Sequence, residues 1–170
     1  MGEEELIEPL ISCPEATYGE QFHQHLLEQY KLYVESVQQV SDHREKANNY
    51  FLTINSSLVA LYGVASAVIG NQGLHVVLPI VGCLVCMAWY SLVRAYKDLN
   101  TAKFKIIHQL ERHLPVALFR SEWQVCDYGV GKKYKPLTHI ERIIPVLFAL
   151  LYVALAAYTI WGPSRISQKT

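Results

Sequence analysis

No Asp, Glu, Lys or Arg occurs between Ala47 and Val93, although the chain contains 15 basic and 15 acidic residues. A helix that crosses a bilayer needs about 20 apolar residues, so this uncharged stretch is too long for one crossing and suits two. Turn-forming residues divide it at Gly70–Gly73. The sequence therefore predicts a transmembrane hairpin that crosses from Tyr50 to Ile69 and returns from His75 to Val93.

Cysteine is scarce, and its pattern does not indicate a metal site. Cys83 and Cys86 have C-x-x-C spacing, but no second cysteine pair and no nearby His completes a zinc tetrahedron. We interpret both as small packing residues in the second crossing. Cys13 and Cys126 stand alone, so no disulfide framework is implied. The sequence predicts no metal and no cofactor.

The chain has no net charge, which argues against a general polyanion binder and predicts no nucleic-acid partner. Ten of its 15 basic residues lie between Arg94 and Arg142, three precede the hairpin, and the turn of the hairpin has none. Because Lys and Arg favour cytoplasmic loops, we expect the N-terminus and residues 94–142 inside and the turn outside. The acidic start, Met1 to Pro14, does not resemble a signal peptide.

An acidic, mobile leader is expected over residues 1–18 and an amphipathic cytoplasmic helix over residues 19–48. Apolar residues in this helix are spaced by three and four, close to a coiled-coil seam. The stripe comprises Phe22, Leu26, Tyr30, Tyr33, Val37 and Val40. It can pack within its own domain or against a neighbouring subunit, and the sequence leaves both possibilities open.

The transmembrane hairpin is assigned to residues 49–94, and its first helix has one small, polar face. This small face comprises Asn48, Asn55, Ser56, Ala60, Gly63, Ser66 and Ala67. Small residues let helices approach closely in lipid, and a buried Asn can hydrogen-bond across the contact. Asn55 is the costliest of these residues to expose to lipid. It is expected either in a helix contact within one subunit or in the lining of a pore.

Residues 95–142 are predicted to form a cytoplasmic helix followed by a basic, aromatic loop, with a short helix around Ser121–Val125. Arg94, Lys97 and Lys103 are candidates for contacts with anionic lipid headgroups. Residues 143–162 are uncharged and long enough for a third crossing, which leaves residues 163–170 as an outer tail. A re-entrant or amphipathic placement of this segment is the alternative.

Six polar residues expected near the cytoplasmic membrane face are candidates for a catalytic cluster. It would comprise His108, Glu111, Arg112, His113, His139 and Glu141. Metal hydrolases that use two His residues of one helix place them four apart, whereas His108 and His113 are five apart. No nucleophile elbow, kinase loop or paired-carboxylate motif accompanies them. We expect no catalytic residues and no enzymatic activity.

Four segments together resemble the RipA family of bacterial membrane proteins. They are Phe51–Ser57, Tyr96–His108, Glu122-Trp123 and Pro136–Glu141. The resemblance covers roughly Gln29 to Trp161, whereas the leader and the Cys126–Lys133 loop are less similar. It implies a protein of the bacterial cytoplasmic membrane that assembles into a homo-oligomer, described in the family's label as octameric, and it brings no agreed enzymatic activity.

The resulting expectation is an all-α integral membrane protein. Two long helices form a hairpin that extends into the cytoplasm, a third transmembrane helix follows near the C-terminus, and the chain is homo-oligomeric. We expect the oligomer to form or gate a pore, or to act as a membrane-perturbing effector. The alternative is a non-enzymatic membrane-anchored scaffold or signalling protein whose cytoplasmic helices bind a protein partner. The expected partners are other copies of the chain, the lipid bilayer and such a cytoplasmic protein.

Overall fold

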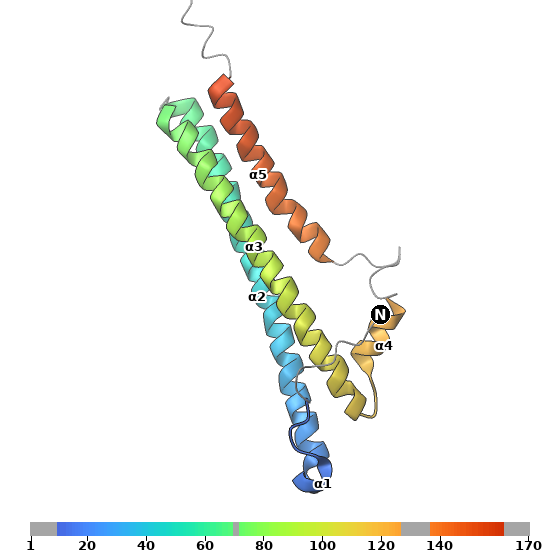
Figure 1. Ribbon diagram of the computed structural model, residues 1–170. Helices are drawn as coiled ribbons and strands as arrows, with labels where there is room; N and C mark the ends of the chain where they lie inside the picture. The colour runs from blue at the N-terminus through green and yellow to red at the C-terminus, as the bar shows by residue number, and fades with distance from the viewer. Residues whose placement is uncertain (1–9, 70–71, 127–136, 162–170) are drawn as a thin grey trace, which may run out of the picture. The chain divides into compact units, whose positions relative to one another are not determined.

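Helices are the only regular structure in the part of the chain that the structure describes. The computed structural model of the 170-residue chain describes residues 10–69, 72–126 and 137–161 (Figure 1). The elements are α1 (Glu15–Tyr18), α2 (Phe22–Val64), α3 (Gln72–Leu110), α4 (Leu118–Val125) and α5 (Leu137–Trp161), with a π-helical turn at Ala65–Ile69 and a 3-10 turn at Glu111–His113. The predicted all-α class is confirmed.

The first two long helices are much longer than a membrane is thick. α2 and α3 contain 43 and 39 residues, so each is about 60 Å long at 1.5 Å per residue. The hydrocarbon core of a bilayer is about 30 Å thick, so only part of each helix can lie within it. Among the described helices, α2, α3 and α5 are long and apolar enough to cross a membrane. The three predicted membrane helices are therefore present.

The chain divides into two compact units. The arm unit comprises Met1–Asp42 and Asp98–Lys135, and the membrane unit comprises His43–Lys97 and Pro136–Thr170. α2 and α3 are antiparallel neighbours that contribute to both units, α4 belongs to the arm unit, and α5 belongs to the membrane unit (Figure 1). The sequence placed the corresponding boundaries at residues 48/49 and 94/95.

The helix ends differ from several predicted boundaries. The π-helical turn extends to Ile69 and α3 begins at Gln72, so the last two residues of the predicted Gly70–Gly73 turn are helical, and residues 70–71 lie outside the described residues. α5 begins at Leu137, six residues before the predicted third crossing. Within the predicted leader, α1 forms one turn that ends at Gly19 with a φ of 94°. Residues 1–9, the predicted basic loop from residue 127 to 135 and the predicted tail lie outside the described residues.

The buried apolar residues lie mainly on one side of α2 and α3. In the arm unit they are Leu26, Val37, Ile107 and Leu110. In the membrane unit they are Ala65, Leu78, Cys86, Trp89, Val93 and Tyr152. Leu26 and Val37 belong to the predicted stripe of α2, so burial within the chain covers the centre of that stripe.

Candidate functional site

A buried polar contact joins the three helices of the membrane unit at Asn55. This α2 residue has no exposed surface. Its amide nitrogen donates to the carbonyl of Phe51 at 2.8 Å, and its side-chain oxygen accepts from the thiol of Cys86 on α3 at 3.3 Å. Its backbone carbonyl accepts from the hydroxyl of Tyr152 on α5 at 3.1 Å. The amide is therefore enclosed within one subunit, which is one of the two placements expected from the sequence.

Tyr152 can reach Asn55 because α3 has no side chain where the phenol ring lies. A Cβ atom added at Gly82 would collide with three ring atoms of Tyr152. Tyr152 is 1% exposed, so the ring is enclosed on every side. Small residues permit this kind of close helix approach in a membrane. Gly82 and Tyr152 thus form the contact that brings α5 onto α3.

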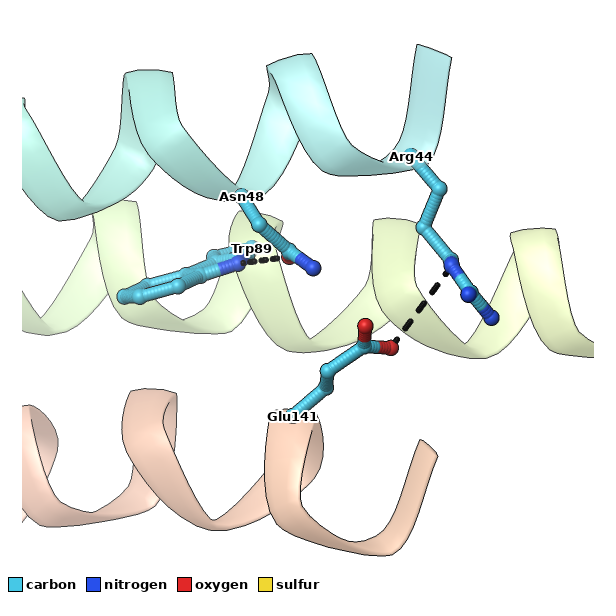
Figure 2. Close-up of polar contacts among 4 residues, drawn as sticks. All are labelled: Arg44, Asn48, Trp89 and Glu141. Carbon is cyan, nitrogen blue, oxygen red and sulfur yellow. Dashed lines mark hydrogen bonds and ion pairs between the residues drawn. The ribbon is translucent and has the colours of Figure 1, made fainter. Parts of the chain in front are cut away.

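Two further polar contacts lie toward the charged end of the membrane unit. The indole nitrogen of Trp89 donates to the side-chain oxygen of Asn48 at 2.9 Å. One helical turn away, the Nε atom of Arg44 lies 3.7 Å from a carboxylate oxygen of Glu141 (Figure 2). That distance makes an ion pair but exceeds a hydrogen bond, and this oxygen has no hydrogen-bond partner among the described residues. Trp89 also stacks on Phe51 with ring centroids 5.8 Å apart.

At the opposite end, the hydroxyl of Tyr62 bonds with the hydroxyl of Thr159 at 3.0 Å and lies 3.5 Å from the carbonyl of Leu155. Asn48, Asn55 and Tyr62 are seven residues apart and therefore lie on one side of α2. We call these three residues the polar column. Each one contacts α3, α5 or both, so the column holds the three apolar helices in a defined register. A buried Asn on a helical seam acts in this way in coiled coils.

The predicted small face separates into two parts. Asn48 and Asn55 belong to the polar column, inside the subunit. Ser56, Ala60, Gly63, Ser66 and Ala67 are exposed. No atom lies within 4 Å of a Cβ added at Gly63. The hydroxyl of Ser66 donates to the carbonyl of Tyr62 at 2.9 Å and lies 3.3 Å from Nδ1 of His75 on α3, so it is satisfied within its own subunit. We call the five exposed residues the outer small face.

In the arm unit, the predicted stripe of α2 meets polar groups of α3. Leu26 and Val37 are buried, whereas Phe22, Tyr30, Tyr33 and Val40 are partly exposed. The ammonium of Lys103 donates to the hydroxyl of Ser36 at 2.8 Å and lies 4.8 Å from the ring centre of Tyr33. Lys103 was a candidate for lipid headgroups, but its ammonium is held inside the arm unit. Of the other two candidates, Arg94 is exposed and Lys97 is partly exposed.

Glu111, which the sequence analysis considered for a catalytic cluster and did not retain, has a structural role. It is 2% exposed, and its two carboxylate oxygens accept from the backbone nitrogens of Phe119 and Arg120 at 2.8 and 3.0 Å. These nitrogens are free donors in the first turn of α4, whose N-cap residue Ala117 has no side chain to bind them. Glu111 therefore caps α4 from a distant position. This explains why α4 begins at Leu118, earlier than the predicted short helix.

The Glu111 carboxylate also changes the titration of its neighbours, which lie outside the apolar segments. The hydroxyl of Tyr30 donates to it at 3.3 Å. Burial and then the negative charge of Glu111 raise the pKa of Tyr30 to about 12. Burial lowers the pKa of His108; Glu111 opposes this shift and Arg120 adds to it. Within the described residues, no group of three or more His, Cys, Asp or Glu side chains could hold a metal ion; the side chain of His139 lies outside them.

Several residues of this site were not singled out from the sequence. No role was assigned from the sequence to Trp89, Tyr62, Thr159 or Gly82. The signal that identifies them is the spacing of seven on α2 together with a polar group at the matching level of a neighbouring helix. That match requires knowledge of which helices are neighbours.

Residues 27–161 match the model of the octameric membrane protein family (8xMP). The match covers most of the chain, from the second turn of α2 to the end of α5. It agrees with the octameric membrane family expected from the sequence, although its description does not carry the RipA name. Among curated proteins and among solved structures there is no match.

Proposed function

The chain belongs to the octameric membrane protein family, and we propose that eight copies form a ring that opens or gates a path through the bacterial cytoplasmic membrane. In this proposal the protein is multi-pass and non-enzymatic, its N-terminus is cytoplasmic, and the outer small face of α2 is directed to the centre of the ring. Membrane location and self-association are properties of the family. We propose the existence of a path through the membrane, the orientation of the chain and the residues that line the path.

The observation that carries the proposal is the exposure of the least apolar membrane helix. The most apolar segment of α2 is less hydropathic than those of α3 and α5, yet only 11% of it is buried in the single subunit, the same share as for the strongly apolar α5. In a bilayer the least lipophilic surface turns to a neighbouring helix or to a central axis. Eight copies of the outer small face would form a narrow wall of small and hydroxyl-bearing residues without charge.

The polar column determines what kind of path this would be. Asn48, Asn55 and Tyr62 are bonded inside each subunit, so they do not supply polar groups to the centre. The remaining wall has only hydroxyls as polar groups, and Ser66 already bonds to its own helix. Weakly polar constrictions gate by loss of water. We therefore infer a path that is closed at rest and opens when the subunits move apart.

The test is release of an encapsulated dye or ion flux from vesicles that contain the purified octamer. Ala60→Leu adds bulk to the outer small face and should reduce release relative to wild type. Ala154→Leu, at an exposed position of the apolar helix α5, makes the same change on a surface expected to face lipid and should leave release unchanged. Vesicles that stay tight with wild-type protein, including in the presence of cell extract, would contradict the pore.

One observation favours the alternative of a membrane-anchored scaffold. On α4, Leu118 and Val125 are 66% and 81% exposed, and they lie on one face because they are seven residues apart. α4 belongs to the arm unit, which contains none of the uncharged segments. Exposed apolar residues outside lipid are typical of protein-binding surfaces. In that case Leu118→Ser would abolish binding of a cytoplasmic partner and leave vesicle permeability unchanged.

A further inference from the structure

The outward faces of α2 and α3 in the arm unit carry opposite charges at matching levels. Glu28 and Glu35 lie two residues from the buried positions Leu26 and Val37, which places them about 200° around α2 from its buried side. Both are exposed, and neither makes an ion pair among the described residues; Glu28 accepts only a 3.5 Å hydrogen bond from Gln24. α2 therefore presents two carboxylates away from its own subunit.

On the other helix the corresponding positions are basic. Lys105 lies two residues from buried Ile107, so it is on the outward side of α3, and Arg112 follows seven residues later in the 3-10 turn. Both side chains are exposed. One subunit thus has two carboxylates on the outer side of α2, with the exposed Lys31 between them, and two basic side chains on the outer side of α3.

The contacts inside the arm unit show which residues of α2 and α3 lie at the same height along the helix pair. Tyr30 bonds with Glu111 and Ser36 bonds with Lys103. Because the helices are antiparallel, each step along α2 corresponds to one step back along α3. Glu35 is then level with Lys105, and Glu28 with Arg112, within about one residue.

A closed ring preserves such levels. All subunits of a cyclic oligomer are related by rotation about one axis, so equivalent atoms lie at one height. If the α2–α3 pair runs along that axis, placing α2 of one copy beside α3 of the next brings Glu35 to the level of Lys105 and Glu28 to that of Arg112. Ring contacts use two different surfaces of each subunit, and an acidic and a basic face meet this requirement.

Apolar residues accompany the charges on both faces. Leu32, which is 64% exposed, lies beside Glu28 and Glu35 on α2. On α3, Leu99 is 45% exposed and Ala102 is exposed, on the side next to Lys105. Apolar surface outside lipid is covered most readily by another protein surface. Opposite charges face each other at only two heights. Asp42 continues the row of Glu28 and Glu35 on α2, but the α3 residue at its height is Asp98, which has the same charge.

We propose that the arm units of neighbouring copies meet through this contact, with Glu35 and Glu28 of α2 facing Lys105 and Arg112 of the adjacent copy's α3. The partner is a second copy of this chain, and the contact determines the order and direction of the ring. The inference rests on the ring assembly contained in the proposed function but not on conduction.

The test exchanges the charges and measures the mass of the purified protein in detergent by light scattering. Glu35→Lys alone and Lys105→Glu alone should each shift the octamer to smaller species. The double exchange should restore the octamer, because the two charges again have opposite signs. Glu122→Lys makes the same change at an exposed position of α4 and should leave the octamer intact. Raising the salt concentration should weaken the wild-type octamer, since salt screens exposed charges.

Two outcomes would overturn the contact. Single exchanges that leave the octamer unchanged show that these charges do not meet. Single exchanges that reduce the mass without recovery in the double variant show a loss of structure instead, and a far-UV circular dichroism spectrum identifies it. Glu35→Cys and Lys105→Cys on differently tagged chains give a second measurement. Both chains carry Cys13→Ser and Cys126→Ser, because these native thiols are free and partly exposed. The proposed contact should then join the two tags by a disulfide. The vesicle assay is separate: a restored octamer in tight vesicles supports the contact and contradicts the pore.

Discussion

The contact between Gly82 and Tyr152 provides the most direct test of how the third membrane helix is held. A Cβ atom at Gly82 collides with the Tyr152 ring, so Gly82→Ala must displace the ring or move α5. Overpacking of a filled contact costs about 1–3 kcal/mol. Displacement of the ring also breaks the hydrogen bond from Tyr152 to the carbonyl of Asn55, which is worth about 1 kcal/mol. The expected cost is about 2–4 kcal/mol.

Such a cost greatly raises the fraction of molecules in which α5 is detached from α3. At about 1.4 kcal/mol for each tenfold change, α5 should leave α3 roughly 30 to 700 times more often. Hydrogen–deuterium exchange of α5 peptides in detergent measures this directly, since amides exchange when the helix detaches. Exchange around Tyr152 should become faster by a factor in this range.

Two variants separate the causes. Gly63→Ala is the matched control, because a Cβ at Gly63 meets no atom within 4 Å; the change should be neutral or favourable by up to about 1 kcal/mol, as for other helical Gly-to-Ala exchanges. Tyr152→Phe removes the hydroxyl alone and should cost only about 1 kcal/mol. If Gly82→Ala exchanges no faster than Gly63→Ala, α5 does not pack on α3 through this ring.

Three further predictions follow from the other contacts. Glu111→Ala should cost about 1–3 kcal/mol by leaving donors of α4 unsatisfied, and faster hydrogen exchange confined to α4 would show it; equal exchange in α4 would refute the capping role. Trp89→Phe should lower the stability of the membrane unit through lost packing and through loss of the hydrogen bond to Asn48, which is worth about 1 kcal/mol. In an Asn48→Ala background its cost should be smaller by about that hydrogen bond, and two losses that simply add would refute the contact. A reporter fused after Thr170 should be periplasmic and one within residues 116–135 cytoplasmic; two reporters on the same side would eliminate the third crossing.

Much of the fold could be predicted from the sequence because it depends on properties that are local in the chain. The uncharged stretch from Ala47 to Val93 and the apolar segment near the C-terminus identify the three membrane helices by length and composition alone. Helix ends were predicted less well. α4 begins at Leu118 because a carboxylate from another element caps it, and no residue adjacent in the chain carries that signal.

The candidate site was predicted only in part. The spacing on α2 placed Asn48 and Asn55 with Ser56 and Ala60 on one face, and it left open whether Asn55 lies in a helix contact or lines a pore. The helix packing separates them: the two amides bond inside the subunit, and the small residues stay exposed. Helical periodicity shows which residues of α2 share a side. The positions of α3 and α5 determine which of those residues are buried and which stay exposed.

The sequence by itself determined that this is a helical membrane protein, because charge is excluded from hydrocarbon and apolar length measures bilayer thickness. It also determined the family, through segments spread over most of the chain. Only the tertiary structure decided that Asn55 is closed off by Cys86 and Tyr152, and that Glu111 organises α4. The physical reason is that a hydrogen bond depends on which atoms meet within about 3 Å. The partners of Asn55 are 31 and 97 residues away, and those of Glu111 lie on a different element.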